Sequence, residues 1–255
     1  MTLTLGAILF AVGLVAGGIN ALAGGSGFLV FPAFIAAGLP PIVANASAFV
    51  SLAPANVVGF AAHGRYLSEA HHSIPLRAAV AALGGVSGSL ILIRTGSEAF
   101  ENVVPWLLLT ATLLFGLGPW VKARIERAYA FEGRRFPLLL YAFEFLICVY
   151  GGYFGVGMGI VMLAIYEVLG QDKFLVANAV KNFVIAIVTF IGVALFASFG
   201  LIAWGPAIVM GLGATIGGYA SVSLAQRLSR SFLRGAVLSW AIGLTIYAFW
   251  TYLDV

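Results

Sequence analysis

Two apolar runs in this sequence are too long to cross a membrane once, and they cover residues 3–38 and 137–169. At about 1.5 Å per residue, a straight helix over the first run would be about 54 Å long, against about 30 Å of membrane hydrocarbon. Each run contains a cluster of glycines, where helix propensity is weakest. We therefore predict that each run breaks at its glycines into a spanning helix and a shorter helix that returns or re-enters.

The composition assigns the rest of the chain to the membrane as well. Hydrophobic residues make up 62% of the 255 residues and charged residues 9%, and the mean hydropathy is +1.08. This is too little polar surface to cover a soluble globule. The 32 glycines suit helices packed closely in lipid and argue against a β-barrel. We predict an all-α, polytopic transmembrane helical bundle of about eight membrane segments, at residues 3–38, 42–62, 74–94, 103–121, 137–169, 174–198, 201–222 and 232–253.

The two halves of the chain resemble each other. A shift of 132 to 133 residues superposes Gly25 on Gly157 and Ala44-Asn45 on Ala177-Asn178. The most charged segment separates the two similar halves. The predicted organisation is a first membrane repeat at 1–121, a basic cytoplasmic connecting loop at 122–136 and a second membrane repeat at 137–255.

Loop charges predict how the halves are related. By the positive-inside rule the basic segment Lys122 to Arg135 is cytoplasmic, which places Arg94 to Asn102 outside and a loop with Arg65 and Arg77 inside. The arginines between residues 227 and 234 also fall inside, but only if the run 137–169 returns. We therefore predict inverted halves, with both termini facing the periplasm, in a multi-pass protein of the inner (plasma) membrane. Inverted halves support alternating access about a midplane site.

The glycine breaks and the polar helix starts that follow them are the predicted substrate site. Unwound backbone persists inside a membrane only where it lines a cavity or meets a ligand, and glycine-rich helix starts expose N–H groups that cradle anions. Lys181 lies in an otherwise apolar helix, where a lysine costs about 2.5–3.5 kcal/mol unless it snorkels to the surface, and such residues usually belong to a ligand pathway. The predicted substrate-binding residues are Gly24, Gly25, Ser26, Gly27, Asn45, Ser47, Gly155, Gly157, Gly159, Asn178, Lys181 and Asn182.

Other polar residues carry weaker predictions. Glu144 is a candidate for proton coupling, although it could also lie near the membrane interface. For Ser51 and Asn56 we favour helix-to-helix hydrogen bonding, with contact to a ligand as the alternative. The histidines do not have the spacing of a metal site, and no nucleophile–base set or phosphate-binding loop is present. We predict no catalytic residue, no metal, no cofactor and no nucleic-acid partner.

The chain resembles the TauE/SafE family of sulfite and organosulfonate permeases over essentially its full length. The resemblance rests on the glycine-rich break followed by Pro32, on the helix start at Ala44 to Ser47, and on the second glycine cluster followed by the helix with Lys181. Members often have a longer glycine run than Gly24-Gly25-Ser26-Gly27 and a threonine at the position of Ala46. The resemblance implies transport of small sulfur-containing anions such as sulfite or sulfonates.

The sequence thus predicts a permease, and not an enzyme, for a small anion. Its partners would be that anion, the lipid bilayer and, as an open alternative, further copies of the chain. The driving force could be a proton gradient or the anion gradient alone. The competing class is a membrane-embedded enzyme or a structural subunit of a membrane complex.

Overall fold

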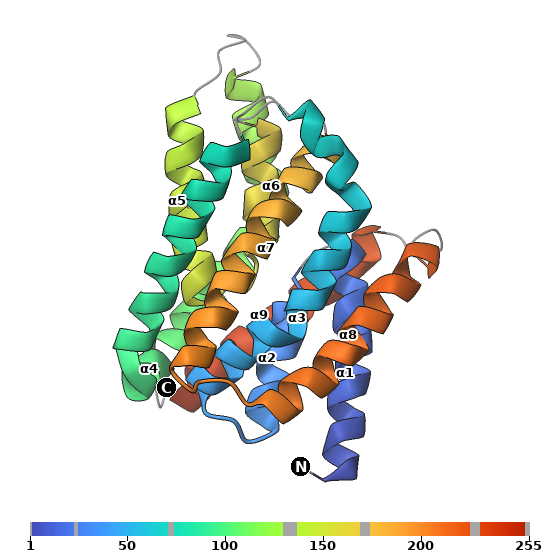
Figure 1. Ribbon diagram of the computed structural model, residues 1–255, viewed down its shortest axis with the longest axis vertical. Helices are drawn as coiled ribbons and strands as arrows, with labels where there is room; N and C mark the ends of the chain where they lie inside the picture. Colours follow the sequence, from blue (N-terminus) through green and yellow to red (C-terminus); the bar gives the residue numbers. More distant parts are fainter. Residues whose placement is uncertain are drawn as a thin grey trace.

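The computed structural model describes residues 2–22, 25–70, 74–129, 137–168, 174–224 and 230–252. All regular structure in these ranges is helical, and the helices form one elongated bundle (Figure 1). This confirms the predicted all-α transmembrane fold. In chain order the elements are α1 Leu3–Leu22, α2 Gly27–Ala36, α3 Pro41–His63, the 3₁₀ helix η1 Gly64–Glu69, α4 Ile74–Tyr129, α5 Pro137–Tyr153, α6 Met158–Val168, α7 Phe174–Ser198, α8 Trp204–Leu224 and α9 Arg230–Tyr252.

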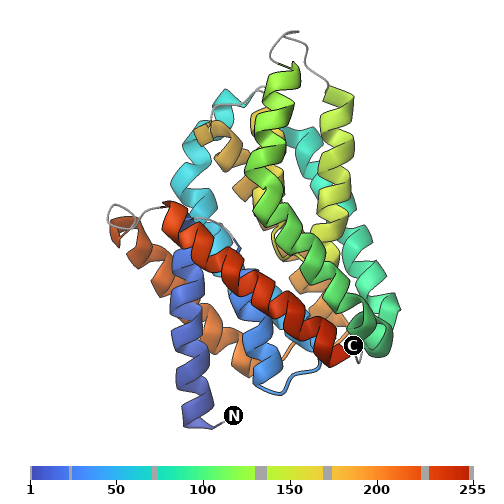
Figure 2. The same ribbon diagram turned by 180° about the vertical axis from the view of Figure 1, so that it is seen from behind.

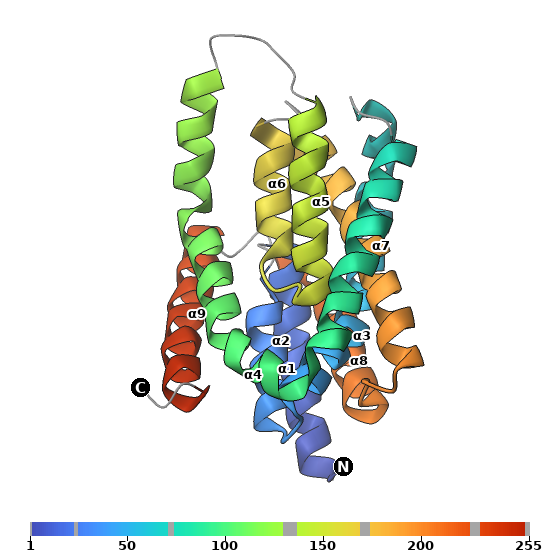
Figure 3. The same ribbon diagram turned by 90° about the vertical axis from the view of Figure 1, so that its left-hand side faces the viewer.

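Both over-long runs break at their glycines, as predicted. The first gives α1 and the short α2, and the second gives α5 and the short α6. Gly25, Gly155 and Gly157 have positive φ angles of 86°, 77° and 81°, a conformation that costs glycine little and other residues much more. The α1–α2 hairpin enters from the end that holds the N-terminus, and the α5–α6 hairpin enters from the opposite end (Figures 1 and 3).

Helix α4 is two helices joined at a sharp turn. Gly96 has φ 74° and ψ 170°, and the chain reverses direction there (Figure 3). The outside segment predicted at Arg94 to Asn102 is therefore mostly helical, because one glycine suffices for the reversal. The second limb continues to Tyr129 and so enters the segment 122–136 predicted as a connecting loop. A helix can continue through polar residues once it has left the hydrocarbon. Residues 130–136, the remainder of the predicted loop, lie outside the described residues.

Two side-chain hydrogen bonds connect equivalent positions of the two halves. Asn56 Nδ2 donates to Thr189 Oγ1 at 3.0 Å, between α3 and α7, and the hydroxyls of Thr112 and Thr245 lie 3.0 Å apart, between α4 and α9. Each pair is 133 residues apart, which matches the shift that superposes the halves. Contacts between equivalent residues lie on a two-fold axis. Helices α3 and α7 run in opposite directions (Figure 1), which is the arrangement that the predicted inverted halves would have.

The first helix of each half packs against the fourth helix of the other half. Gly17 of α1 and Gly217 of α8 each lie directly against a backbone carbonyl of the partner helix, where an added Cβ would have no room. Gly88, on the first limb of α4, lies in the same way against α5. Small residues let helix backbones approach closely in lipid. These close contacts join helices from both predicted repeats. Both termini lie toward the same end of the bundle (Figure 2).

The outside of the bundle is apolar, which is the surface that lipid requires. Leu83, Leu138, Ile246 and Trp250 are all more than 60% exposed. In water such side chains would form large exposed apolar patches, which soluble proteins avoid. Within the described residues, five helical segments are long and apolar enough to cross a membrane, and Gly27–Ala36 and Leu138–Tyr153 are shorter apolar helices.

Candidate substrate-binding site

The two glycine breaks meet inside the bundle. A Cβ added to Gly27, the first residue of α2, would come within 2.9 Å of Val156 Cγ2 in the second break. Each break also starts a helix: Phe28 N donates to Gly25 O at 3.1 Å, and Met158 N donates to Gly155 O at 3.3 Å. The N-termini of α2 and α6, which carry the positive ends of their helix dipoles, are therefore brought to one place.

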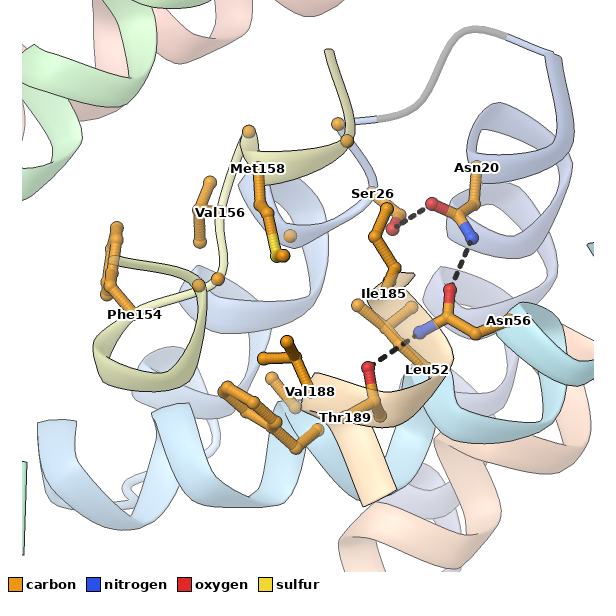
Figure 4. Close-up of a pocket in the computed structure, with 18 of the residues that line it drawn as sticks. Asn20, Ser26, Leu52, Asn56, Phe154, Val156, Met158, Ile185, Val188 and Thr189 are labelled. Atoms are coloured by element: carbon orange, nitrogen blue, oxygen red, sulfur yellow. Dashed lines mark hydrogen bonds between the residues drawn. The ribbon is translucent and has the colours of Figure 1, made fainter. Parts of the chain in front are cut away.

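A pocket of about 100 Å³ lies between these two breaks (Figure 4). It is lined from both halves, by α1, α2, α3, α5, α6 and α7. A water molecule needs about 10–15 Å³ of such space, so the pocket has room for an anion of a few heavy atoms. Its lining residues are Asn20, Gly25, Ser26, Gly27, Ala48, Phe49, Leu52, Asn56, Gly151, Phe154, Gly155, Val156, Gly157, Met158, Gly159, Lys181, Asn182, Ile185, Val188 and Thr189.

One wall of the pocket is a chain of hydrogen-bonded polar side chains (Figure 4). Ser26 Oγ donates to Asn20 Oδ1 at 3.0 Å, and Asn20 Nδ2 donates to Asn56 Oδ1 at 3.4 Å. Asn56 Nδ2 then donates to Thr189 Oγ1 at 3.0 Å. We call these four residues the amide wall. It joins the first break to α1, α3 and α7.

Helix α7 adds Lys181 and Asn182 to the lining. The Lys181 side chain runs past the start of α6, where its Cδ lies 3.8 Å from the Cβ position of Gly159. Among the described residues that line the pocket, Lys181 is the one charged side chain. One cation, two helix N-termini and several amide and hydroxyl groups form an environment suited to an anion.

The structure brings eight of the predicted residues to this pocket: Gly25, Ser26, Gly27, Gly155, Gly157, Gly159, Lys181 and Asn182. Three others lie outside its lining. Asn45 Nδ2 donates to Tyr153 O at 3.0 Å and ties α3 to α5, while Ser47 Oγ accepts a bond from Ala203 N at 3.0 Å before α8. Asn178 is half-buried on α7 and is not part of the lining. Gly24 lies outside the described residues.

Sequence reasoning missed Asn20 and Thr189, and for Asn56 it favoured a packing role over a ligand role. Asn56 does bond across helices, and Ser51 Oγ likewise donates to Ala207 O at 3.0 Å, so both serve packing as predicted. Asn56 also lines the pocket. The internal repeat could have indicated Thr189, since the shift that superposes Asn45 on Asn178 also places Asn56 on Thr189.

A buried ion pair lies away from the pocket, between α4 and α5. Arg77 Nη1 donates to Glu144 Oε2 at 3.0 Å, and both side chains are fully buried. Arg77 Cζ lies 4.4 Å from the ring centroid of Tyr166 on α6. The sequence placed Arg77 in a cytoplasmic loop. It is instead the fourth residue of α4, and its buried charge is paired with Glu144 and lies over the ring of Tyr166.

The comparisons with known proteins identify membrane transporters among the relatives of this chain. The sequence model of the family described as sulfite exporter TauE/SafE matches residues 9–248. The chain is 28% identical to a probable membrane transporter protein of a Sinorhizobium species, over 94% of this chain and 90% of the relative. It is 28% identical to one of Haemophilus influenzae, over 94% and 92% of the two chains, and 27% identical to YfcA of Escherichia coli K12, over 89% and 84%. No solved structure matches the chain.

Proposed function

Because the chain belongs to the TauE/SafE family of membrane transporters, we propose that its cargo is a small anion, a sulfur oxyanion such as sulfite or a sulfonate, bound in the pocket between the glycine breaks. The observation that supports this most is the single lysine in a pocket where two helix N-termini meet. All three features favour negative charge. The volume of about 100 Å³ favours a compact anion over a large organic one.

The inverted halves support alternating access as the mechanism. The two hairpins enter from opposite ends and touch at the pocket, so exchange of their conformations would expose the same pocket to either side of the membrane. We place the protein in the cytoplasmic membrane, with the connection between α4 and α5 in the cytoplasm, on the basis of the loop arginines. The names of the relatives favour transport over the membrane-embedded enzyme considered from the sequence.

We extend the proposal to coupling of anion transport to protons, and Glu144 is the candidate residue for carrying the proton. The buried carboxylate contacts Arg77 and lies next to α6, whose first residue lines the pocket. A proton on Glu144 would weaken its attraction to Arg77 and so loosen the attachment of α5 to α4. The alternative is transport driven by the anion gradient alone.

Lys181→Met tests the anion site. Hydrogen bonds to charged groups contribute about 1.5–3 kcal/mol, so uptake of sulfite or a sulfonate into liposomes should fall by about 10-fold to 150-fold. Lys181→Arg keeps the charge and should change the preference among anions. Arg94→Met is the matched control, because it removes an exposed cation outside the pocket. Normal uptake by a well-folded Lys181→Met protein would overturn the proposed site.

Valine at Gly25 or Gly157 tests the glycine breaks. Both positions have positive φ, which a β-branched residue tolerates poorly, and both line the pocket. We expect each variant to lose the rise in melting temperature that the transported anion gives the wild type. If both fold and are still stabilised like the wild type, the breaks are packing features and the site lies elsewhere.

A further inference from the structure

The second glycine break contains two successive backbone N–H groups without an acceptor. Around them, Met158 N donates to Gly155 O at 3.3 Å and Ile160 N donates to Gly157 O at 3.1 Å. No atom of the described residues accepts a hydrogen bond from Val156 N or Gly157 N. Val156 and Gly157 are buried, and both line the pocket (Figure 4). Buried N–H groups without partners are rare, and successive ones form concave sites that bind anions.

Tyr150, near the end of α5, fixes the peptide group that joins Val156 to Gly157. Its hydroxyl donates to Val156 O at 2.7 Å. Its own carbonyl accepts bonds from Phe154 N at 2.9 Å and from Gly155 N at 3.3 Å, so the break is folded back onto this residue. The C=O and N–H of one trans peptide point in opposite directions. Since Val156 O is turned toward Tyr150, which is not part of the lining, Gly157 N–H points away from Tyr150.

Glycine at position 157 makes this orientation one of two that the backbone can adopt. Rotating the peptide group by half a turn would change φ of Gly157 from 81° to about −100°, and glycine adopts both signs about equally well. The rotated peptide would present a carbonyl oxygen where the N–H now lies, and such an oxygen repels an anion. The Tyr150 hydroxyl stabilises the first orientation, because only this orientation brings Val156 O within its reach.

The repeat shows that a glycine break can form without such a hydroxyl. The shift of 132 residues that superposes Gly25 on Gly157 places Gly18 at the position of Tyr150. Glycine has no side chain with which to hold a carbonyl group. The first half thus folds its own break without an equivalent of Tyr150, so the bond to Val156 O is not a general requirement of the fold.

We propose that Tyr150 is a positioning residue for the anion: it holds the peptide between Val156 and Gly157 with its N–H toward the pocket, where this N–H donates to an oxygen of the bound anion. The inference rests on the proposed function. Tyr150 does not touch the anion and acts through the peptide group. The loss of one such hydrogen bond corresponds to about 3-fold to 10-fold weaker binding.

Tyr150→Phe tests this role in the purified full-length protein, because it keeps the ring and removes the hydroxyl. The probe is methanesulfonate, and its binding is measured as thermal stabilisation of the native state. The concentration that gives half of the maximal stabilisation should rise about 3-fold to 10-fold. The KM for uptake into liposomes should rise by the same factor, with little change in the maximal rate.

Ser51→Ala is the matched control for this variant. It also removes a bond from a buried hydroxyl to a backbone carbonyl, that of Ala207, but it does so outside the pocket. Both variants should lower the melting temperature of the unliganded protein, and only Tyr150→Phe should weaken methanesulfonate binding. A well-folded Tyr150→Phe protein that binds methanesulfonate like the wild type would overturn the role of Tyr150.

Gly157→Ala tests the same peptide without a change at Tyr150. The nearest atom to the added methyl would be Ala111 Cβ at 3.6 Å, an ordinary contact, so the change acts through φ. Alanine disfavours positive φ and hence favours the rotated peptide, which should weaken methanesulfonate binding about 3-fold to 10-fold. Gly38→Ala is its control, because Gly38 has φ 85° and lies outside the pocket with nothing within 4 Å of its Cβ position.

The double variant assigns both effects to one peptide group. Once the peptide has rotated, Val156 O is no longer there for Tyr150 to hold, so the double variant should bind no more weakly than the weaker single variant. Effects that multiply would overturn the proposal, as would wild-type binding by Gly157→Ala if Tyr150→Phe does not fold. If methanesulfonate fails to stabilise the wild type, the proposed anion site fails as well. Equal stabilisation of wild type and Tyr150→Phe refutes the role of Tyr150 alone.

Discussion

Replacing Glu144 with glutamine should destabilise the protein strongly, because it leaves the Arg77 guanidinium as an uncompensated buried charge. Both side chains are 0% exposed, and their nearest atoms lie 3.0 Å apart. Removing one partner of such a pair costs about 3–5 kcal/mol. In a chain of this size each kcal/mol lowers the melting temperature by about 2–4 °C, so Glu144→Gln should lower it by about 6–20 °C.

The two single variants should differ in a way that identifies the cause. Arg77→Met leaves a carboxyl group that can become neutral by binding a proton, whereas the guanidinium left in Glu144→Gln stays charged. Arg77→Met should therefore be the less destabilised variant, and a lower pH should reduce its defect. The double variant should recover much of the loss, because replacing both partners of a buried pair is often nearly neutral.

The measurement is a double-mutant cycle of melting temperatures in detergent, with transport in liposomes as a second readout. A Glu144→Gln protein that melts like the wild type would refute this account of the ion pair. The double variant also separates packing from proton coupling. If it is stable and its transport keeps the pH dependence of the wild type, Glu144 does not carry the coupled proton.

Three further predictions concern packing and topology. Gly217→Leu should destabilise the α1–α8 contact by about 1–3 kcal/mol or prevent folding, whereas Gly243→Leu, where nothing lies within 4 Å of the Cβ position, should be tolerated in the same melting assay. Ser51→Ala removes the bond to the carbonyl of α8 and should lower stability by about 1 kcal/mol, measured by chemical unfolding in detergent. Single cysteines at Arg124 and Arg230, in a cysteine-free background, should both be shielded from an impermeant thiol reagent outside intact cells, and labelling of only one would contradict the inverted topology.

Much of the fold could be predicted because membrane thickness is a fixed length. Runs of 36 and 33 residues cannot cross it once, and glycine is the weakest point in each, so both hairpins follow from the sequence. The end of α4 could not be placed, because polar residues beyond the hydrocarbon allow a helix to continue as readily as to stop.

The candidate site was predictable where the signal is local and not where it depends on distant partners. Glycine clusters and a lysine in an apolar helix are visible in a short window of sequence. Asn20 gave no such signal, because its role comes from meeting Ser26 and Asn56 in space. Arg77 was misplaced for the same reason, since its partner Glu144 lies 67 residues away.

The close fit of α1 against α8 bears on how the protein is made. A ribosome releases α1 first, yet the groove that receives its glycines belongs to a helix that begins at Trp204. For most of synthesis α1 is therefore in the lipid without α8, the helix against which it packs in the finished protein. The first limb of α4, by contrast, can contact α5 soon after α5 emerges. Final assembly should thus be late and should depend on the complete chain. Either half produced separately should be a target for membrane quality control, and co-expression of the two halves should rescue both.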